Sequence, residues 1–294
     1  MQRVWVGCLA WLVCIAFQPN WTGSGKPKTA TATLLHSLPD ESKDSLFFVQ
    51  KLRIAQAQKG TSAQVMAVAQ SFLGTPYQHG TLEGASSEHL VVNLSGLDCW
   101  TFVENCLATA LCTSDSQASF DTYKNHLRTL RYWGGTVNGY GSRIHYFTGW
   151  ILQAEKLGFI RDLTKDLGGV ELHKKVSFIT DNPHLYPKLK DTTAKQKVFV
   201  AQKRIDAHPW YFIPKAKIAA MEANIQDGDI VVLTSSKKNL DVEHQGFAIR
   251  QADGKVHLLH ASSTFKKVMI ATRPLAEYVT RIPSMSGIMV CRPE

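Results

Sequence analysis

The chain lacks long hydrophobic runs and paired cysteine motifs, and each absence excludes a class of protein. After residue 17, no apolar stretch approaches the roughly 20 residues that a helix needs to cross a bilayer. The six cysteines form no C-x-x-C pair, so a zinc knuckle and a thioredoxin-like motif are disfavoured, and their spacing predicts no metal site. No internal repeat is visible. What remains is a chain of 294 residues, long enough to bury an extensive apolar core.

Composition and charge are those of a folded globule with a basic surface. Hydrophobic residues make up 44% and charged residues 19% of the chain. The 33 Lys and Arg against 24 Asp and Glu leave a net charge of +9, which favours anionic partners such as nucleic acid, acidic lipid or a carboxylate-rich polymer. The Lys-rich segment 188–217 is interrupted by apolar and aromatic residues, so we interpret it as a solvated face or loop and expect no nucleic-acid partner.

The N-terminus has the pattern of a secretory signal. Residues 1–17 carry one basic residue, Arg3, followed by an apolar stretch too short to span a membrane. We predict a signal peptide with cleavage near Ala16, and therefore export to the periplasm or the medium. A buried or interfacial helix and a lipid anchor on Cys8 or Cys14 are the alternatives.

The rest of the chain divides into a polar linker, residues 18–42, and one folded domain, residues 43–294. Helical periodicity and stop signals predict helices at 43–59, 62–73, 98–112, 120–130 and 148–157. β-rich runs predict strands at 229–233, 245–250 and 255–260. The pattern is typical of an α+β domain. The helix that follows Asp98 is apolar on nearly all sides and is predicted to be the central buried helix.

Cys99 is the strongest candidate for a reactive side chain. It follows a capping residue, Asp98, at the first turn of the central helix, where free backbone N–H groups and the helix dipole stabilise a thiolate. This placement predicts a thiol pKa lowered toward neutrality, with the Asp98 carboxylate turned to the helix N–H groups. The alternative is a core cysteine. For Cys106, Cys112 and Cys291 we predict buried, small apolar side chains.

A nucleophilic thiol needs a histidine within hydrogen-bond reach, and His244 and His260 lie on one predicted hairpin. A two-residue loop would send the two imidazoles to opposite faces of the ribbon. A three-residue loop with Gly254 in the left-handed conformation would pair residue 246 with 260 and bring His244 diagonally beside His260, roughly 7 Å away. The sequence Ala-Asp-Gly suits the second loop. His244 would then lie beside Cys99, and His260 would orient the ring of His244.

At these residues the chain resembles the NlpC-like, papain-like superfamily of cysteine peptidases and amidases, and within it the bacterial N-acetylmuramoyl-L-alanine amidases. The resembling motifs span residues 45–292. They are Phe72-Leu-Gly-Thr-Pro-Tyr77, Gly80-Thr-Leu-Glu83, Leu97-Asp-Cys-Trp-Thr-Phe-Val-Glu-Asn105, Ser142-Arg-Ile-His-Tyr-Phe-Thr-Gly-Trp150, Asp227-Gly-Asp-Ile230, His244-Gln-Gly-Phe247 and Leu259-His-Ala-Ser262.

The resemblance implies a papain-like fold, in which a central helix carrying the cysteine packs on a small antiparallel sheet. It also implies a cell-wall hydrolase acting on peptidoglycan or muropeptides, with no metal or organic cofactor. The resemblance also implies two groups of site residues, one catalytic and one substrate-binding. The implied catalytic residues are Cys99 as nucleophile, His244 as base and His260 as orienting residue. The implied substrate-binding residues are Tyr77, Arg143, His145 and Tyr146.

Several alternatives stay open at the level of sequence. The bond between D-glutamate and the diamino acid of the stem peptide is a second possible target. The alternative for Tyr77 is a turn aromatic packed on the core, and the alternative for Arg143 is an ion-pair partner of Glu104. A non-catalytic wall-binding module would need only a structural cysteine. A metalloenzyme using Glu243 and the two hairpin histidines is disfavoured, because strand alternation points Glu243 away from His244.

Overall fold

The computed structural model describes residues 40–84 and 87–294. The expected signal peptide and nearly all of the linker lie outside these residues. The first helix, α2 (Asp40–Gln56), begins inside the range that was expected to be linker. In the described part of the chain, no helix combines the length and the apolar character required to cross a membrane.

Helices and short strands alternate irregularly along the chain. After α2, the helices are α3 (Thr61–Ser71), α4 (Cys99–Leu111), α5 (Phe120–Arg131), α6 (Phe147–Lys156), α7 (Phe178–Asp181), α8 (Thr192–Asp206), α9 (Ile218–Met221) and α10 (Leu275–Thr280). The strands are β1 (Ile160–Asp162), β2 (Val170–Glu171), β3 (Tyr211–Pro214), β4 (Ile230–Ser235), β5 (Val242–Arg250), β6 (Val256–Ser262), β7 (Lys267–Pro274) and β8 (Met285–Pro293). The predicted α+β class is confirmed.

The strands form one antiparallel sheet of eight strands in the order β2-β3-β8-β4-β5-β6-β7, with β1 paired to β8. The three predicted strands are β4, β5 and β6, at its centre. The sheet is therefore larger than the small one predicted. The strands β1, β2 and β3 have two to four residues each, too few to show a period in the sequence.

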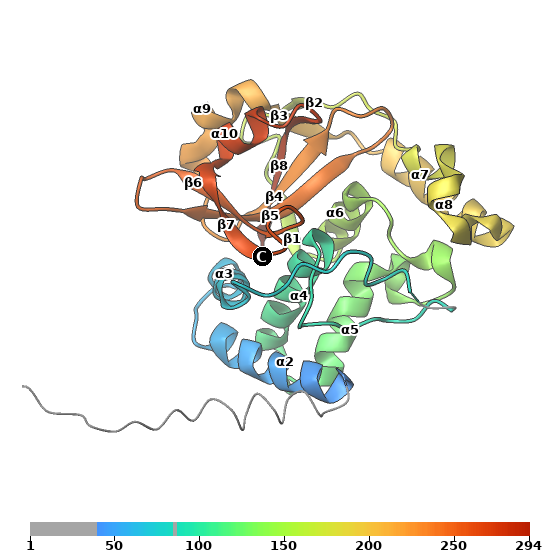
Figure 1. Ribbon diagram of the computed structural model, residues 1–294, viewed down its shortest axis with the longest axis horizontal. Helices are drawn as coiled ribbons and strands as arrows, with labels where there is room; N and C mark the ends of the chain where they lie inside the picture. Colours follow the sequence, from blue (N-terminus) through green and yellow to red (C-terminus); the bar gives the residue numbers. More distant parts are fainter. Residues whose placement is uncertain (1–39, 85–86) are drawn as a thin grey trace, which may run out of the picture. The chain divides into compact units, whose positions relative to one another are not determined.

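Helices cover both faces of the sheet. In Figure 1, α2, α3, α4 and α5 lie on one side, and the short helices α9 and α10 lie on the other. Two separate apolar cores correspond to these sides, one containing Phe102 and Phe247, the other containing Val231 and Leu275. This cover explains why every residue of β4 and β6 is buried.

Helix α4 is the central buried helix, as predicted. Ten of its residues, from Thr101 to Ala110, are buried. Phe102 holds it in place, because its ring packs edge-on against Phe72 of the neighbouring segment at 6.2 Å and against Phe247 of β5 at 5.4 Å. The first turn of α4 is thereby fixed against the strand that carries His244.

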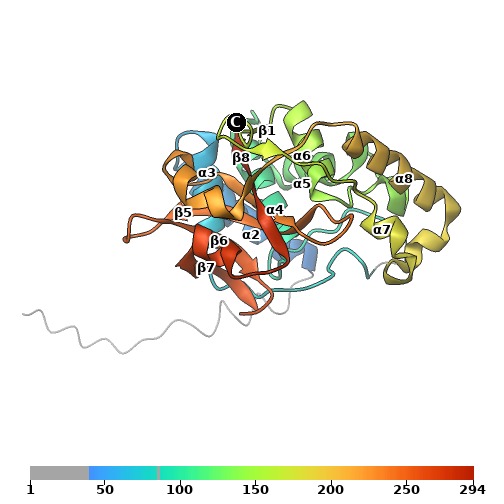
Figure 2. The same ribbon diagram turned by 90° about the horizontal axis from the view of Figure 1, so that it is seen from above.

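Helices α7 and α8 form the end of the domain farthest from β6 and β7. Figures 1 and 2 both show α7 and α8 there. Helices α5 and α6 agree with prediction to within one residue at each end. Helix α8 was not predicted: the Lys-rich segment forms a helix that buries Val198 and Ile205 and exposes its other side. The expectation of a solvated face was right, and that of a loop was wrong for residues 192–206.

Candidate active site

Cys99 is the first residue of α4, and Asp98 caps the helix. The Oδ1 atom of Asp98 accepts hydrogen bonds from the backbone N–H of Thr101 at 2.8 Å and from its hydroxyl at 2.9 Å. The Thr101 hydroxyl closes the capping box by accepting the Asp98 N–H at 3.0 Å. The carboxylate is thus turned to the helix N–H groups, as predicted. Cys99 keeps partial exposure to solvent.

The pKa of the Cys99 thiol corrects the sequence-based prediction. Burial raises this pKa to about 12, and the negative charge of Asp98 adds to the increase. Hydrogen bonds from the backbone N–H groups of Gln245, Cys99 and Trp100 oppose the shift without overcoming it. The helix dipole therefore does not hold a preformed thiolate. Crowding around the sulfur is a property of the tertiary structure that the helix start alone did not reveal.

The two hairpin histidines are hydrogen-bonded to each other. The Nε2 atom of His244 lies 2.6 Å from the Nδ1 atom of His260, and the rings meet edge to face with centroids 4.8 Å apart. Strand β5 pairs with β6 so that Phe247 opposes Leu259, and Gly254 has a φ of 75° in the turn. This is the register of the three-residue loop, which confirms the prediction that the two imidazoles share one face.

Both imidazoles are held in the neutral form. Burial lowers the pKa of His244 to about 3, and the charge of His260 contributes in the same direction. Burial alone lowers the pKa of His260 to about 4. At neutral pH each ring carries a single proton, so the hydrogen bond between them has one donor and one acceptor.

The sulfur of Cys99 accepts a hydrogen bond from the backbone N–H of Gln245, the residue that follows His244 on β5. Two tyrosines surround it. Burial raises the pKa of Tyr77 to about 12, with further contributions from Cys99 and Asp98. Burial, and then Cys99, also raise the pKa of Tyr278, whose ring lies 5.6 Å from that of His260. Tyr278 was missed by the sequence reasoning, since only the folding of α10 onto the sheet brings it there.

A cleft of about 610 Å³ adjoins the start of α4. Its walls come from the segment after Tyr77, from α4, from the segment before α6 and from the loop between α7 and α8. The lining residues are His79, Gly80, Leu82, Glu83, Asp98, Trp100, Tyr140, Arg143, Ile144, His145, Ile179, Leu185, Tyr186, Pro187 and Lys188. Trp100 packs edge-on against Phe147 at 5.0 Å, which fixes the indole at this wall.

Arg143 lines the cleft, but its guanidinium is already engaged. It donates to the carbonyl of Leu82 at 2.9 Å and to the carboxylate of Glu83 at 2.6 Å, and it lies 3.5 Å from Glu88. The alternative pairing of Arg143 with Glu104 is wrong. Glu104 instead pairs with Arg131 at 2.8 Å inside the core.

His145 and Tyr146 occupy different environments. His145 lines the cleft, and its Nε2 donates to the carbonyl of Tyr140 at 2.9 Å. Burial, followed by the charge of Arg143, lowers the pKa of His145 to about 3. Tyr146 is buried, and its hydroxyl accepts hydrogen bonds from the Ile179 N–H and from Gln202, both at 2.8 Å. Tyr146 therefore supports the cleft wall at Ile179 from behind.

The other described cysteines are free thiols outside the cleft. Cys106, Cys112 and Cys291 are fully buried, which confirms the prediction made for them. Among the described cysteines, Cys99 alone is partly exposed, and it stands at a helix start between two residues that line the cleft, Asp98 and Trp100.

Comparison with known proteins gives the family. Residues 67–288 match the AmiA-like family, described as N-acetylmuramoyl-L-alanine amidase-like. The chain belongs to the AmiA-like family. The matched region contains the cysteine, both histidines and every residue that lines the cleft. No match was found among the curated proteins.

Several solved structures are similar to this chain. One is an N-acetylmuramoyl-L-alanine amidase from Bacteroides uniformis, with 33% identity and a TM-score of 0.73 over 80% of this chain and 99% of that one. A Bacteroides fragilis protein, provisionally named a xylanase, has 34% identity and a TM-score of 0.70 over 76% and 98%. A Legionella pneumophila protein of the DUF1460 family shares the fold, at 18% identity and a TM-score of 0.68 over 86% and 95%.

Proposed function

We propose that this AmiA-like protein is a cysteine amidohydrolase that cleaves the bond between N-acetylmuramic acid and L-alanine in peptidoglycan fragments. One observation supports the mechanism above the others. The sulfur of Cys99 meets β5 at the residue that follows His244, and His244 is hydrogen-bonded to His260 at 2.6 Å. In this proposal Cys99 is the nucleophile, His244 the base and His260 the residue that orients it.

The hydrogen bond between the histidines assigns the protons. For His244 to accept the thiol proton through Nδ1, its own proton must reside on Nε2, which donates to Nδ1 of His260. The proton of His260 then resides on its Nε2. His260 thus selects the tautomer of His244 and fixes the ring plane, the part that a carboxylate or amide plays in other triads.

The reaction proceeds through a thioester. Because the thiol is protonated at rest, His244 removes its proton as the sulfur attacks the amide carbonyl. In this proposal the backbone N–H groups of Cys99 and Trp100, which bond to the sulfur at rest, stabilise the oxyanion as it forms, and His244 then protonates the departing amine. Water hydrolyses the thioester. No step in this sequence uses a metal or an organic cofactor.

The substrate assignment rests on the family and on the cleft. The similar Bacteroides uniformis protein is named an N-acetylmuramoyl-L-alanine amidase. The cleft beside Cys99 has about 610 Å³, within the usual range for a bound small molecule. Lys188 lines it, and a carboxylate-rich substrate suits a chain with a net charge of +9. Arg143 contributes by holding Glu83 and the wall, since its guanidinium is occupied.

Two further parts of the proposal concern fold and location. A helix-start cysteine packed on an antiparallel sheet that carries the histidines supports placement in the papain-like NlpC superfamily. The N-terminal sequence supports export as a periplasmic or secreted protein. Within the same superfamily, cleavage between D-glutamate and the diamino acid is the second candidate reaction.

The name of the Bacteroides fragilis relative suggests a glycosidase. The residues that line the cleft do not favour that activity. Glycoside hydrolysis generally needs two carboxyl groups on either side of the bond. The acidic residues among those that line the cleft are Glu83 and Asp98. Glu83 is paired with Arg143, and Asp98 caps helix α4, so both are committed to structure.

The proposal is tested with defined muropeptides and mass spectrometry of the products. The wild-type protein should release the intact stem peptide with a free L-alanine amino group. Cys99→Ala should show no turnover while its circular dichroism and melting temperature stay close to wild type. The matched control is Cys291→Ala, a buried cysteine in β8, which should keep turnover. Turnover by Cys99→Ala would refute the assignment, and cleavage after D-glutamate would move it to the second candidate.

A further inference from the structure

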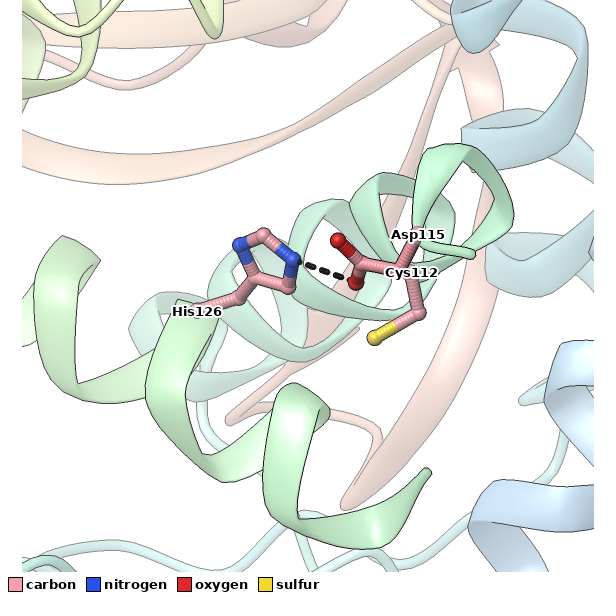
Figure 3. A group of neighbouring side chains, drawn as sticks. All are labelled: Cys112, Asp115 and His126. Atoms are coloured by element: carbon pink, nitrogen blue, oxygen red, sulfur yellow. Dashed lines mark hydrogen bonds and ion pairs between the residues drawn. The ribbon is translucent and has the colours of Figure 1, made fainter. Parts of the chain in front are cut away.

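Three side chains that bind metals in other proteins converge at the opposite end of helix α4. They are Cys112, Asp115 and His126, and their sulfur, carboxylate and ring-nitrogen atoms all lie within 4.8 Å of one another. Figure 3 shows them facing a common point, with the ring of His126 directed at the carboxylate of Asp115. The Nε2 atom of His126 lies 2.8 Å from Oδ2 of Asp115.

The local fold explains this convergence. Cys112 ends α4 and begins a single 3₁₀ turn, Cys112–Ser114, which is followed by Asp115. A 3₁₀ turn has three residues per turn, so side chains at i and i+3 project from the same side, here those of Cys112 and Asp115. Helix α5 supplies His126, whose ring packs edge-on against Phe159 at 6.1 Å. The 3₁₀ turn thus positions two of the donor atoms, and helix α5 positions the third.

The electrostatic environment favours a cation. The C-terminal end of α4 carries the negative end of the helix dipole, the reverse of the environment of Cys99 at its N-terminal end. Asp115 adds a carboxylate beside the sulfur. The thiol of Cys112 donates to the carbonyl of Ala108 at 3.3 Å. A bound cation would offset the negative end of the helix dipole and the charge of Asp115.

We propose that Cys112, Asp115 and His126 form a binding site for a divalent cation of the Zn²⁺ class. The donor set of one thiolate, one imidazole and one carboxylate is the set that Zn²⁺ accepts, at about 2.3 Å for sulfur and 2.0–2.2 Å for nitrogen and oxygen. The side chains of His126 and Asp115 are 22% and 29% exposed, which gives access from solvent and room for water as a fourth ligand.

Binding changes the bonding in a defined way. The S–H bond of Cys112 breaks, its proton passes to solvent and a sulfur–metal bond forms. The hydrogen bond between His126 and Asp115 is replaced by one bond from each residue to the metal, and the proton of the imidazole then resides on Nδ1 of His126. The metal would then join the end of α4 to α5. Because the site lies at the end of α4 opposite Cys99, its role is structural and independent of the proposed hydrolysis.

Zn²⁺ binding is measured by equilibrium dialysis in a Cys99→Ala background, because Cys99 and its histidines form a second thiol–imidazole group. We expect about one Zn²⁺ per chain. Adding Cys112→Ala should weaken binding by at least about tenfold, and adding His126→Gln should do the same. Adding Cys291→Ala is the matched control, because it removes a buried cysteine elsewhere, and should leave binding unchanged.

Co²⁺ provides a second readout that depends on the sulfur. The Cys99→Ala protein should show a thiolate-to-cobalt charge-transfer band that disappears with Cys112→Ala and persists with Cys291→Ala. Melting temperatures measured without metal establish that each variant is folded. If the Cys99→Ala protein binds no Zn²⁺ at micromolar concentrations, or binds it equally after Cys112→Ala, the three residues form only a hydrogen-bonded cluster and the proposal is overturned.

Discussion

The Nε2 atom of His244 lies 2.6 Å from the Nδ1 atom of His260, so a second imidazole stands where many triads have a carboxylate. A neutral ring can fix the tautomer of its neighbour, but it does not attract positive charge as an aspartate does. The lowered pKa of His244 agrees with this, because burial is followed by the charge of His260 as the cause. In the proposed mechanism, proton transfer from Cys99 therefore accompanies attack on the substrate.

The pH dependence of hydrolysis follows from these pKa values. The active state needs a neutral His244, with a pKa of about 3, and a thiol of Cys99 with a pKa of about 12. Protonation of the imidazole abolishes the base, so activity falls as the pH drops toward its pKa. We expect kcat/KM to vary little between about pH 5 and 9, well inside both values, as measured with a defined muropeptide in buffers of constant ionic strength.

The contrary result would be a bell-shaped profile whose acidic limb reports protonation of a thiolate and whose alkaline limb reports deprotonation of an imidazolium. That profile would mean that substrate-free Cys99 and His244 already share an ionised pair. Alkylation is an independent check. At pH 6, iodoacetamide should modify Cys99 more slowly than a free cysteine with a pKa of about 8.5, and the rate should keep rising to high pH.

Replacing His260 tests its role as a positioning residue. His260→Ala should lower kcat by about 10²–10⁴-fold, because His244 loses the partner that selects its tautomer. The same change removes the charge that lowers the pKa of His244, so the acidic limb of the pH profile should move upward. His257→Asn is the control on the same strand, since His257 bonds to Ala271 and Asp253. An unshifted limb in His260→Ala would contradict the orienting role.

Gly246 keeps the histidine pair in register, because β5 and β6 approach closely there. A Cβ atom at this position would lie 2.5 Å from the carbonyl of Leu259 and 2.9 Å from Cβ of His260. Gly246→Ala should therefore reduce stability by about 1–3 kcal/mol and lower kcat by displacing His260. Urea unfolding and muropeptide kinetics measure the two effects.

The matched control for this change is Gly287→Ala in β8. Its Cβ atom would lie 2.1 Å from the carbonyl of Ile213, a comparable clash away from the histidines. That variant should lose stability yet keep kcat per folded molecule. Equal losses of kcat in the two variants would show that Gly246 has no particular influence on the site.

Much of the site was predictable because it depends on local signals. Asp98 before an apolar helix predicts both the cap and the position of Cys99. The Ala-Asp-Gly loop predicts the strand register, and that register alone places His244 and His260 on one face. These features need only the residues within one helix turn or one hairpin.

Features that depend on distant segments were not predictable in this way. The raised pKa of Cys99 comes from burial by other parts of the chain, and Tyr278 reaches His260 only through the packing of α10. The convergence of Asp115 and His126 depends on how α5 packs against the end of α4. Neither hydrophobic period nor motif spacing contains this information.

A last prediction concerns the ion pair beneath the site, where Glu104 of α4 and Arg131 of α5 are both almost fully buried and lie 2.8 Å apart. Glu104→Leu leaves a buried guanidinium without its partner and should reduce the free energy of unfolding by about 3–5 kcal/mol. The double variant Glu104→Leu/Arg131→Met removes both charges and should recover most of that loss, because it avoids an uncompensated buried charge.

The control for this prediction is Glu277→Ala. It breaks exposed pairs with Arg273 and Arg281 and should leave the urea midpoint nearly unchanged. A double variant no more stable than Glu104→Leu would mean that packing, rather than charge pairing, sets the energy of this contact.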